Sequence, residues 1–428
     1  MKKFLTAFVN VLALAALGFC GGVWVSYAVG VGPERVVVER APVVPAPENA
    51  VSGLDFSILR EVYGVVSKNY FSFDTLSGTT ASYGLARGFV ESLGDRHTTF
   101  FDPTEAKRFQ ELLSGDFEGI GAYVDKADFG VYVQQIIAGS PAKEAGVLQG
   151  DVILKANGVE LKDLALPVAI SKIRGPDGSW VELEILRPGK HGSLTLRVQR
   201  RNIVIPSVEA KTIDGNVAYI AVSTFGDKTA DEFSAEVAKA YENGAKGLVV
   251  DLRDNGGGYL ETAVEILSQF VDRGHTVVTV KQTGISDKSY VSSGRAWPAI
   301  PTVVLVNGNS ASASEITAGA LKEYGLAVLV GERTFGKGSV QQPFNLSDGS
   351  EIKVTVAHWF TPNGKGIDGK GIDPDVPVSF QSEDFDKKFD RQLDAAKKVL
   401  GVYKKDGLDA ARAWRPAETG TGSAKPKK

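Results

Sequence analysis

Cysteine and histidine are scarce in this 428-residue chain, which holds one cysteine, Cys20, and four histidines. A single cysteine cannot close an intramolecular disulfide, and a cysteine-based metal cluster needs several thiolates. Because the four histidines are scattered along the sequence, we do not expect a metal site built on them either. A large excess of positive or negative charge is also missing, since the formal net charge is only −3. This argues against nucleic acid or a polyanionic surface as the main partner.

Glycine and apolar residues are plentiful by comparison. The chain contains 48 glycines, and 43% of its residues are hydrophobic. Such a composition is typical of a globular protein with many turns rather than of a disordered one. A chain of this length is too long for one compact core, so we expect two or three domains.

Charge is absent from a long run of residues near the start of the chain. After Met1, Lys2 and Lys3, no charged residue occurs from Phe4 to Gly32. A basic start followed by an apolar run is typical of an export signal, and this run is long enough to span a membrane. Small residues at Ser26-Tyr27-Ala28 would suit a signal peptidase, so cleavage stays open. By the positive-inside rule, we expect an exported, periplasmic or extracytoplasmic protein that is anchored to the inner (cytoplasmic) membrane.

The next two segments are predicted to be a linker and a helical region. Residues 32–53 are rich in proline and valine and are predicted to form an extended linker. Residues 54–114 carry apolar side chains at three- and four-residue steps, which predicts helices. The turn Gly94–Phe100 contains His97, which lacks an obvious carboxylate to orient it and is interpreted as structural.

A serine-rich turn is the most informative stretch of the sequence. It follows the β-branched run Pro301–Val306, which predicts a buried strand, and it precedes Ile316–Tyr324, which predicts a helix. A serine at a strand-to-helix turn is exposed beside the N–H groups of the helix start. A buried lysine with a lowered pKa could activate it, and Lys337 lies between two glycines further on. The alternative is that Ser310, Ser312 and Ser314 are turn and capping residues and that Lys337 is a surface lysine.

Two motifs in order favour the catalytic interpretation. The segments Ser310–Ile316 (SASASEI) and Phe335–Gln342 (FGKGSVQQ) resemble the signature of the carboxyl-terminal-processing proteases, serine peptidases with a Ser-Lys dyad. The resemblance implies that Ser312 is the nucleophile, that Lys337 is the general base and that Gln341 orients the lysine amine. His358, in the strand after this block, is the runner-up as the base.

A glycine cluster supplies a candidate oxyanion hole. The segment Asp251–Gly258 follows the apolar run Gly247–Leu252, which predicts a buried strand. Successive glycines allow backbone N–H groups to point at a ligand oxygen, as an oxyanion hole requires. The family has a similar D-L-R-x-N-x-G-G motif, which implies that Gly257 or Gly258 acts together with the N–H of Ala313. A phosphate-binding loop is the alternative, but no Walker-type lysine follows.

Residues 115–200 resemble a PDZ domain of the bacterial, circularly permuted kind. The series from Gly139 to Gly158 (GSPAKEAGVLQGDVILKANG) carries this resemblance. It implies a loop that clasps a peptide C-terminus through successive backbone N–H groups. The loop residues are Gly119, Ile120, Gly121 and Ala122. For Arg174, carboxylate binding and helix capping both stay open.

The remaining segments complete the predicted architecture. Strands and helices alternate from Asn202 onward, which predicts an α/β sheet. The family resemblance makes residues 201–380 a crotonase-like α/β protease core in a multidomain α+β protein with the PDZ domain inserted. Residues 381–414 are predicted to be helical, with a final helix at 382–402. Residues 415–428 are predicted to be a disordered tail.

The sequence therefore predicts an exported serine endopeptidase that cleaves proteins near their C-termini without a metal or organic cofactor. Its partners would be proteins or peptides with free C-termini and the membrane at its N-terminal segment, but no nucleic acid. An adaptor protein and a homo-oligomer stay open. Two rival functions are a catalytically silent PDZ scaffold, which would be expected to lose Ser312, Lys337 or Gln341, and an acyl-CoA enzyme, which would have no use for a PDZ domain.

Overall fold

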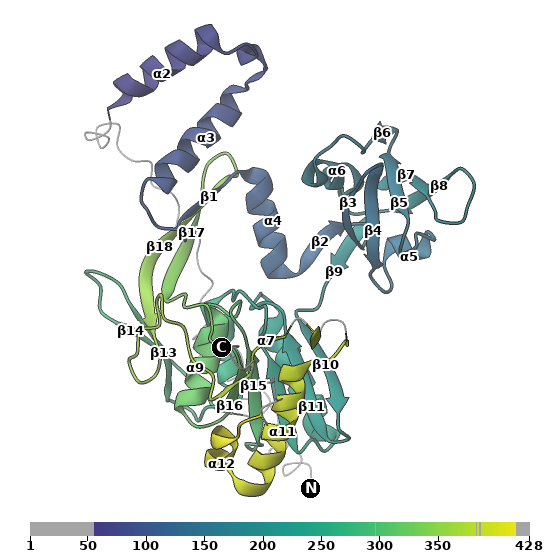
Figure 1. The fold of residues 1–428 in the computed structure, drawn as a ribbon. Coiled ribbons are helices and arrows are strands. Elements are labelled where there is room, and N and C mark those ends of the chain that lie inside the picture. The colour runs from purple at the N-terminus through teal and green to yellow at the C-terminus, as the bar shows by residue number, and fades with distance from the viewer. Residues whose placement is uncertain (1–54, 296, 382, 385–386, 417–428) are drawn as a thin grey trace, which may run out of the picture. The chain divides into compact units, whose positions relative to one another are not determined.

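The computed structural model describes residues 55–295, 297–381, 383–384 and 387–416 (Figure 1). The predicted signal or anchor, the linker and nearly all of the predicted tail lie outside these residues. The chain forms two compact units. The larger unit consists of the chain up to Ala106, Ala210–Phe225 and Phe233 onward, and the smaller unit of Lys107–Glu209 and Gly226–Glu232. No helix in the described ranges combines the length and apolar character that crossing a membrane requires.

A parallel sheet forms the centre of the larger unit. Its strand order is β10-β11-β12-β15-β16-β19, and each pair from β11 to β19 is parallel. The strands are β10 (Val208–Ile213), β11 (Val217–Val222), β12 (Gly247–Asp251), β15 (Thr302–Val306), β16 (Val328–Gly331) and β19 (Val376–Pro377). Every residue of β12, β15 and β16 is buried. Such continuous apolar runs are expected when both faces of a parallel sheet are covered.

Helices cover this sheet. They are α7 (Thr229–Glu242), α8 (Leu260–Leu267), α9 (Ala313–Glu323), α11 (Arg391–Asp406) and α12 (Leu408–Ala413). Side chains of α11, including Ala396 and Val399, share one apolar cluster with Val249 and Val303 of the sheet. The prediction of one final helix at 382–402 is wrong in its bounds: residues 387–390 are not helical, α11 extends to Asp406, and α12 follows it. Helix α11 begins at Arg391 because the side chain of Asp390 accepts a hydrogen bond from the N–H of Leu393 at 2.9 Å and caps it.

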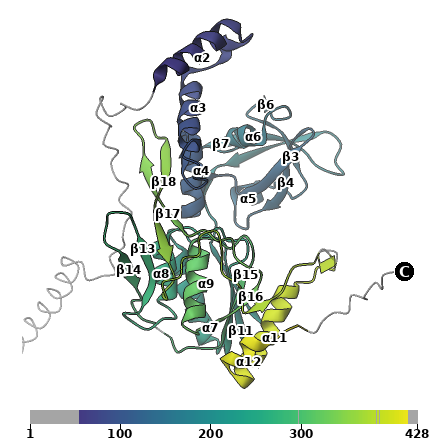
Figure 2. The same cartoon turned by 60° about the vertical axis from the view of Figure 1, so that its left-hand side comes forward.

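A second, antiparallel sheet in the larger unit joins distant parts of the chain. Its order is β1-β18-β13-β14, and β17 pairs with β18. The strands are β1 (Thr99–Phe101), β13 (Thr276–Lys281), β14 (Lys288–Val291), β17 (Ser339–Asn345) and β18 (Glu351–Phe360). Figure 2 shows β17 and β18 as a long hairpin. Because β1 pairs with β18, the turn before Thr99 lies beside the second strand of the hairpin that follows Lys337.

The N-terminal segment forms the predicted helices α2 (Phe56–Asn69), α3 (Gly78–Glu91) and α4 (Pro103–Ser114), with a short 3-10 turn at Phe73–Thr75. The apolar side chains that predicted α2 are exposed in the described part of the chain. Strand β1 was not predicted, because three residues carry too little periodicity to be recognised.

The smaller unit holds a separate apolar core. Its strands are β2 (Asp116–Gly119), β3 (Ala122–Ala127), β4 (Gly130–Ile136), β5 (Val152–Ala156), β6 (Val159–Glu160), β7 (Trp180–Leu186), β8 (Ser193–Gln199) and β9 (Arg201–Val204). Its short helices are α5 (Pro141–Glu144) and α6 (Leu166–Ile173). Alternate residues of β7 are buried, and Val181, Leu183 and Ile185 enter the core.

Candidate active site

Ser312 lies at a strained turn between a buried strand and a helix. Strand β15 ends at Val306 and helix α9 begins at Ala313, so Ser312 directly precedes the helix. Its backbone has φ of 54° and ψ of −117°, a conformation that residues other than glycine rarely adopt. Such strain clusters at functional sites, and it exposes a nucleophile beside the N–H groups of a helix start.

The neighbouring serines have structural roles. The hydroxyl of Ser310 donates to the carbonyl of Leu252 at 2.7 Å, and that of Ser314 donates to the carbonyl of Asn255 at 2.9 Å. Both side chains are fully buried. They therefore fasten the serine turn to the glycine-containing loop that follows β12, and the interpretation as turn residues holds for these two serines. Ser312 is half-buried.

Glu315 connects the serine turn to the lysine loop. One oxygen of its buried carboxylate accepts the N–H groups of Ser312 and Lys337, each at 2.9 Å. The other oxygen accepts the N–H of Gly336 at 2.7 Å and the hydroxyl of Thr334 at 2.5 Å. No role was predicted for Glu315, although a serine followed three residues later by glutamate is a capping-box signal. A single carboxylate thus fixes the main chain at both members of the predicted dyad.

The glycines beside Lys337 allow close backbone approach, as predicted. Gly336 has φ of 88°, and a Cβ there would lie 2.8 Å from the nitrogen of Gly371. The N–H of Gly338 donates to the carboxylate of Asp368 at 2.9 Å. The indole of Trp359 donates to the carbonyl of Lys337 at 2.9 Å. The main chain of Lys337 is therefore held on both sides, which restricts where its amine can lie.

The surroundings of Lys337 favour its neutral form. Burial is the main cause that lowers the pKa of its amine to about 8, and the positive charge of Lys353 adds to this. The carboxylates of Glu315 and Asp95 act in the opposite direction. No hydrogen bond joins Ser312 Oγ to Lys337 Nζ in the described residues, and such bonds are often long before substrate binds.

Gln341 is fixed by two hydroxyl groups. Its side-chain nitrogen donates to Ser339 Oγ at 2.8 Å and to Thr355 Oγ1 at 3.1 Å. Both of its amide hydrogens are therefore in use. The contact to the Lys337 amine that the family resemblance implies is not among these bonds, and the amide oxygen is the atom left to accept one.

Gly257 and Gly258 occupy different positions relative to Ser312. A Cβ on Gly257 would lie 2.7 Å from Cβ of Ser312, so only glycine fits there. The N–H of Gly257 donates to the side chain of Asn255 at 2.8 Å. The N–H of Gly258 has no hydrogen bond to any residue that the structure describes, and the same holds for the N–H of Ala313 at the start of α9.

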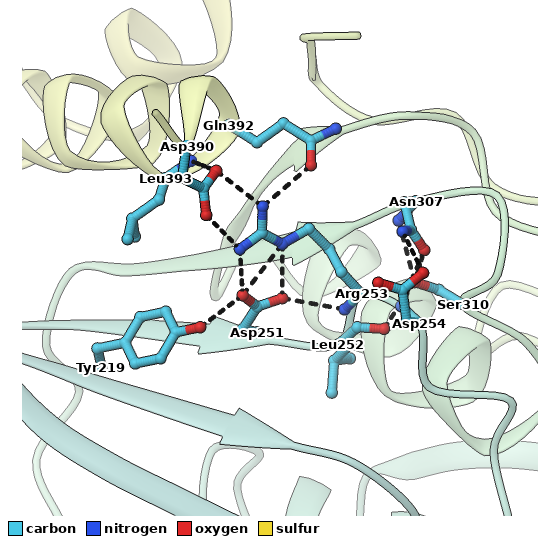
Figure 3. Close-up of polar contacts among 10 residues, drawn as sticks. All are labelled: Tyr219, Asp251, Leu252, Arg253, Asp254, Asn307, Ser310, Asp390, Gln392 and Leu393. Carbon is cyan, nitrogen blue, oxygen red and sulfur yellow. Dashed lines mark hydrogen bonds and ion pairs between the residues drawn. The ribbon is translucent and has the colours of Figure 1, made fainter. Parts of the chain in front are cut away.

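A partly buried ionic cluster holds the start of this loop (Figure 3). The guanidinium of Arg253 pairs with Asp251 at the end of β12 and with Asp390 at the start of α11, at 2.5 and 2.8 Å. It also donates to the side chain of Gln392 at 3.1 Å. Burial disfavours the charge of Arg253, but the two carboxylates outweigh it and raise the pKa of the guanidinium. Burial, followed by the charge of Asp251, raises the pKa of Tyr219.

A second cluster joins the same loop to the serine turn. Asp254, with φ of 58°, donates its N–H to the side chain of Asn307 at 3.0 Å. Its carboxylate accepts the side-chain amides of Asn307 and Asn309 at 2.9 and 2.8 Å. The loop that carries the glycines is thereby tied both to α11 and to the segment before Ser312.

The two histidines weighed in the sequence lie in different surroundings. His358 is exposed on β18. His97 is half-buried, and burial, followed by the positive charges of Lys337 and Arg96, lowers its pKa. The described residues hold no group of three or more histidine, cysteine or acidic side chains arranged for a metal ion.

In the smaller unit, the predicted carboxylate-binding loop connects β2 to β3. Gly121 has φ of 77°, and a Cβ there would lie 2.3 Å from Cβ of Ser140. The carbonyls of Ile120 and Gly121 accept hydrogen bonds, whereas their N–H groups have no partner within the described part of the chain. Ala122 begins β3. The side chain of Ile120 lies in the core and is only 4% exposed.

Arg174 follows helix α6 and binds a carboxylate of its own unit. Its guanidinium pairs with Glu111 at 2.7 Å and donates to the carbonyl of Glu118 at 3.1 Å. It also lies over the ring of Phe117. These contacts occupy the guanidinium in the structure.

The comparisons with known proteins concern both units. Residues 216–378 match peptidase family S41, and residues 118–198 match the PDZ domain. The carboxy-terminal processing protease CtpA of Bacillus subtilis is 37% identical over 366 residues, which cover 86% of this chain and 74% of that protein. CtpB of the same organism is 37% identical over 340 residues, covering 78% and 70%. The solved structure of a photosystem II D1 C-terminal processing protease matches at 31% identity, with a TM-score of 0.44, over 82% of this chain and 91% of that chain.

Proposed function

The chain belongs to peptidase family S41 and is a carboxy-terminal processing serine protease with a PDZ domain, and on this premise we propose that Ser312 is its nucleophile and Lys337 its general base. One observation carries the proposal. The same carboxylate, that of Glu315, holds the backbone of both residues. The lowered pKa of the Lys337 amine suits the role of a base.

The chemistry follows from these positions. Neutral Lys337 takes the hydroxyl proton of Ser312 as Oγ attacks the scissile carbonyl carbon. The resulting ammonium then gives its proton to the leaving amine, which breaks the C–N bond and leaves an ester on Ser312. Lys337 next removes a proton from water, which attacks the ester, and the proton returns to Ser312 as the acid product leaves.

The oxyanion of each tetrahedral intermediate requires two donors. The N–H of Ala313 stands at the helix start, where the helix dipole favours negative charge. Gly258 is the better second donor, because the N–H of Gly257 already donates to Asn255. In this assignment Gly257 provides the space beside Ser312 rather than a hydrogen bond.

The smaller unit is proposed to select substrates by their free C-termini. The N–H groups of Ile120 and Gly121, which have no partner among the described residues, support this, since successive amides suit a terminal carboxylate. A peptide would add as a strand beside the loop, with Gly119 and Ala122 at its two ends. Arg174 is left out of this assignment because Glu111 occupies its guanidinium.

We also propose a crotonase-like core, a circularly permuted PDZ domain and an exported, membrane-anchored location for this protein. The parallel sheet with helices on it supports a crotonase-like core, and the order of elements in the smaller unit supports a circularly permuted PDZ domain. Lys2, Lys3 and the uncharged run to Gly32 support export and anchoring at the inner membrane. A periplasm-active reporter fused after residue 428 should be active, and a reporter that works only in the cytoplasm should be silent.

A covalent label tests the assignment of the nucleophile. An organofluorophosphonate should modify Ser312, and peptide mass spectrometry should place the added mass on that residue. The Lys337→Ala variant should react much more slowly, because it lacks the base. Labelling of Ser310 or Ser314 instead of Ser312 would contradict the proposal.

A further inference from the structure

Asp95 lies behind the proposed lysine base, in the turn that precedes β1. One oxygen of its half-buried carboxylate accepts the N–H of His97 at 3.0 Å. The other accepts the N–H of Thr98 at 3.2 Å and its hydroxyl at 2.6 Å. The side chain of Thr355 also interacts with this carboxylate and lowers its pKa. The carboxylate of Asp95 therefore links the turn to strand β18.

Strand pairing fixes these contacts in place. Thr99 pairs with Lys353, and the N–H of Thr355 donates to Thr98 Oγ1 at 3.0 Å. On the other side of β18, Thr355 pairs with Gln341 of β17. The turn before β1, which is distant in the sequence, thus brings Asp95 to the hairpin that carries Thr355 and Gln341.

The direction of each hydrogen bond among these residues follows from the carboxylate. Burial would raise the pKa of Asp95, but the hydrogen bonds from Thr355, Thr98 and His97 outweigh burial and hold it well below its usual range. An ionised carboxylate only accepts hydrogen bonds, so the hydroxyl of Thr355 donates its single proton to Asp95. The oxygen of that hydroxyl then accepts from the nitrogen of Gln341, at 3.1 Å.

The amide of Gln341 is thereby oriented. Its second N–H donates to Ser339 at 2.8 Å, so its nitrogen has no further proton to give. The carbonyl oxygen is the end of the amide that remains for an amine. A reversed amide would present N–H groups to Lys337 and repel the hydrogens of its ammonium form.

Resting on the proposed function of Lys337, we propose that Asp95 is a positioning residue for this protease: through Thr355 it fixes the amide of Gln341 so that the amide oxygen receives the amine of Lys337. The charge of Asp95 also acts on Lys337 directly. The charged and titratable groups that act on the amine are Lys353 of β18, Glu315 of α9, and Asp95 and His97 of the turn.

The Asp95→Asn variant tests both effects at once. Asparagine keeps one acceptor oxygen where aspartate has two, so it cannot accept all the donors that converge on residue 95. Where its N–H₂ group faces Thr355, the hydroxyl proton of Thr355 turns toward Gln341 and reverses the amide. We expect kcat to fall by about ten- to a hundredfold, the range typical of groups that orient a catalytic residue, while KM for a free-acid peptide changes little. Loss of the negative charge should also shift the ascending limb of kcat/KM to lower pH, because Asp95 raises the pKa of Lys337.

Variants of Thr355 separate the hydrogen-bond relay from the charge. Thr355→Val removes the hydroxyl and should lower kcat without shifting the ascending limb of kcat/KM to lower pH. Thr355→Ser, which keeps the hydroxyl, should restore most of the activity lost in Thr355→Val. Asp348→Asn is the matched control, because Asp348 accepts hydrogen bonds from Ser350 in the turn of the same hairpin and acts on neither Lys337 nor Gln341. Its kcat and pH profile should equal those of the parent.

The outcomes are distinct. Unchanged kcat and pH profile in Asp95→Asn, or equal activity of Thr355→Val and Thr355→Ser, would overturn the role of Asp95. A loss of activity that matches a loss of thermal stability, with kcat normal once the folded fraction is counted, would also overturn it. Activity in Lys337→Ala would instead overturn the proposed function, and that variant is measured in the same series.

Discussion

The backbone N–H groups of Ser312 and Lys337 donate to the same carboxylate oxygen of Glu315, each at 2.9 Å. The proposed nucleophile and base come from two loops that are separate in the sequence, so their spacing depends on this shared acceptor. The other oxygen binds Gly336 and Thr334. A change at Glu315 should therefore disturb the dyad geometry without removing either member.

The first prediction is that Glu315→Gln loses both stability and activity. One glutamine oxygen can keep two of the four donors, but the N–H₂ group would face the other two and leave them unpaired. Leaving a buried donor unpaired costs about 1–3 kcal/mol, so we expect a loss of about 2–5 kcal/mol in the free energy of unfolding. Urea denaturation measures this loss, and kcat should fall at least about tenfold. Glu236→Gln, which removes only a surface partner of Lys239, is the control and should be neutral.

The second prediction concerns the dyad. Ser312→Ala and Lys337→Ala should abolish peptide hydrolysis and keep the circular dichroism spectrum of the parent. Lys337→Arg should be equally inactive, because a guanidinium cannot release its proton in a protein. Substantial hydrolysis by Lys337→Arg would mean that another group is the base, and the first to examine would then be His358.

The third prediction concerns pH. Because the ammonium form of Lys337 is inactive as a base, kcat/KM should rise with pH and level off above about 8, the pKa of this amine. Lys353→Met removes a positive charge that lowers this pKa, so the ascending limb should move to higher pH. This direction is opposite to the one expected for Asp95→Asn. A limb that stays in place in Lys353→Met would show that Lys353 does not act on the base.

The motifs allowed the strand-to-helix turn and the glycine-containing loops of the candidate site to be predicted from the sequence. The turn around Ser312, the glycines beside Lys337 and the glycine loop after β12 all lie where their local residue patterns predict. Glu315 and Asp95 received no role, because their partners are distant in the sequence and become visible only when loops and strands pair. Asp95 meets Thr355, and Arg253 meets Asp390, through the fold alone. The start of α11 was missed for a local reason, since the cap at Asp390 outweighs the apolar periodicity before it.

The fourth prediction concerns the ion pairs of Arg253, which connect the glycine-containing loop after β12 to α11. Arg253→Lys keeps the charge but cannot form the forked contacts to Asp251 and Asp390. We expect it to lose about 2–4 kcal/mol in the free energy of unfolding, because carboxylates in this cluster lose partners, and to lower kcat because the loop beside Ser312 loosens. Asp390→Asn should cost less, since asparagine can still cap α11. Equal effects of the two variants, or full activity of Arg253→Lys, would show that this connection does not support the site.

The fifth prediction is that the PDZ domain binds the free C-terminus of the substrate. The terminal carboxylate would receive the N–H groups of Ile120 and Gly121, and hydrogen bonds to a charged acceptor are roughly twice as strong as neutral ones. Amidating the last residue should therefore weaken binding by about 1–3 kcal/mol. Affinities of matched free-acid and amide peptides for the Ser312→Ala variant measure this difference, and cleavage rates by the active protein should follow it.

A Gly121→Ala variant provides the structural counterpart of this chemical change. The positive φ of Gly121 and the 2.3 Å separation from Cβ of Ser140 mean that a methyl group must displace the loop. Free-acid and amide peptides should then bind equally weakly, because the N–H groups no longer converge on the carboxylate. Gly189→Ala, at a turn of the same unit where the φ is also positive but no atom lies within 4 Å, controls for backbone strain alone and should keep the preference for the free acid. If the parent protein binds both peptides equally, the loop does not recognise the chain end, and the domain must act on substrates through another surface.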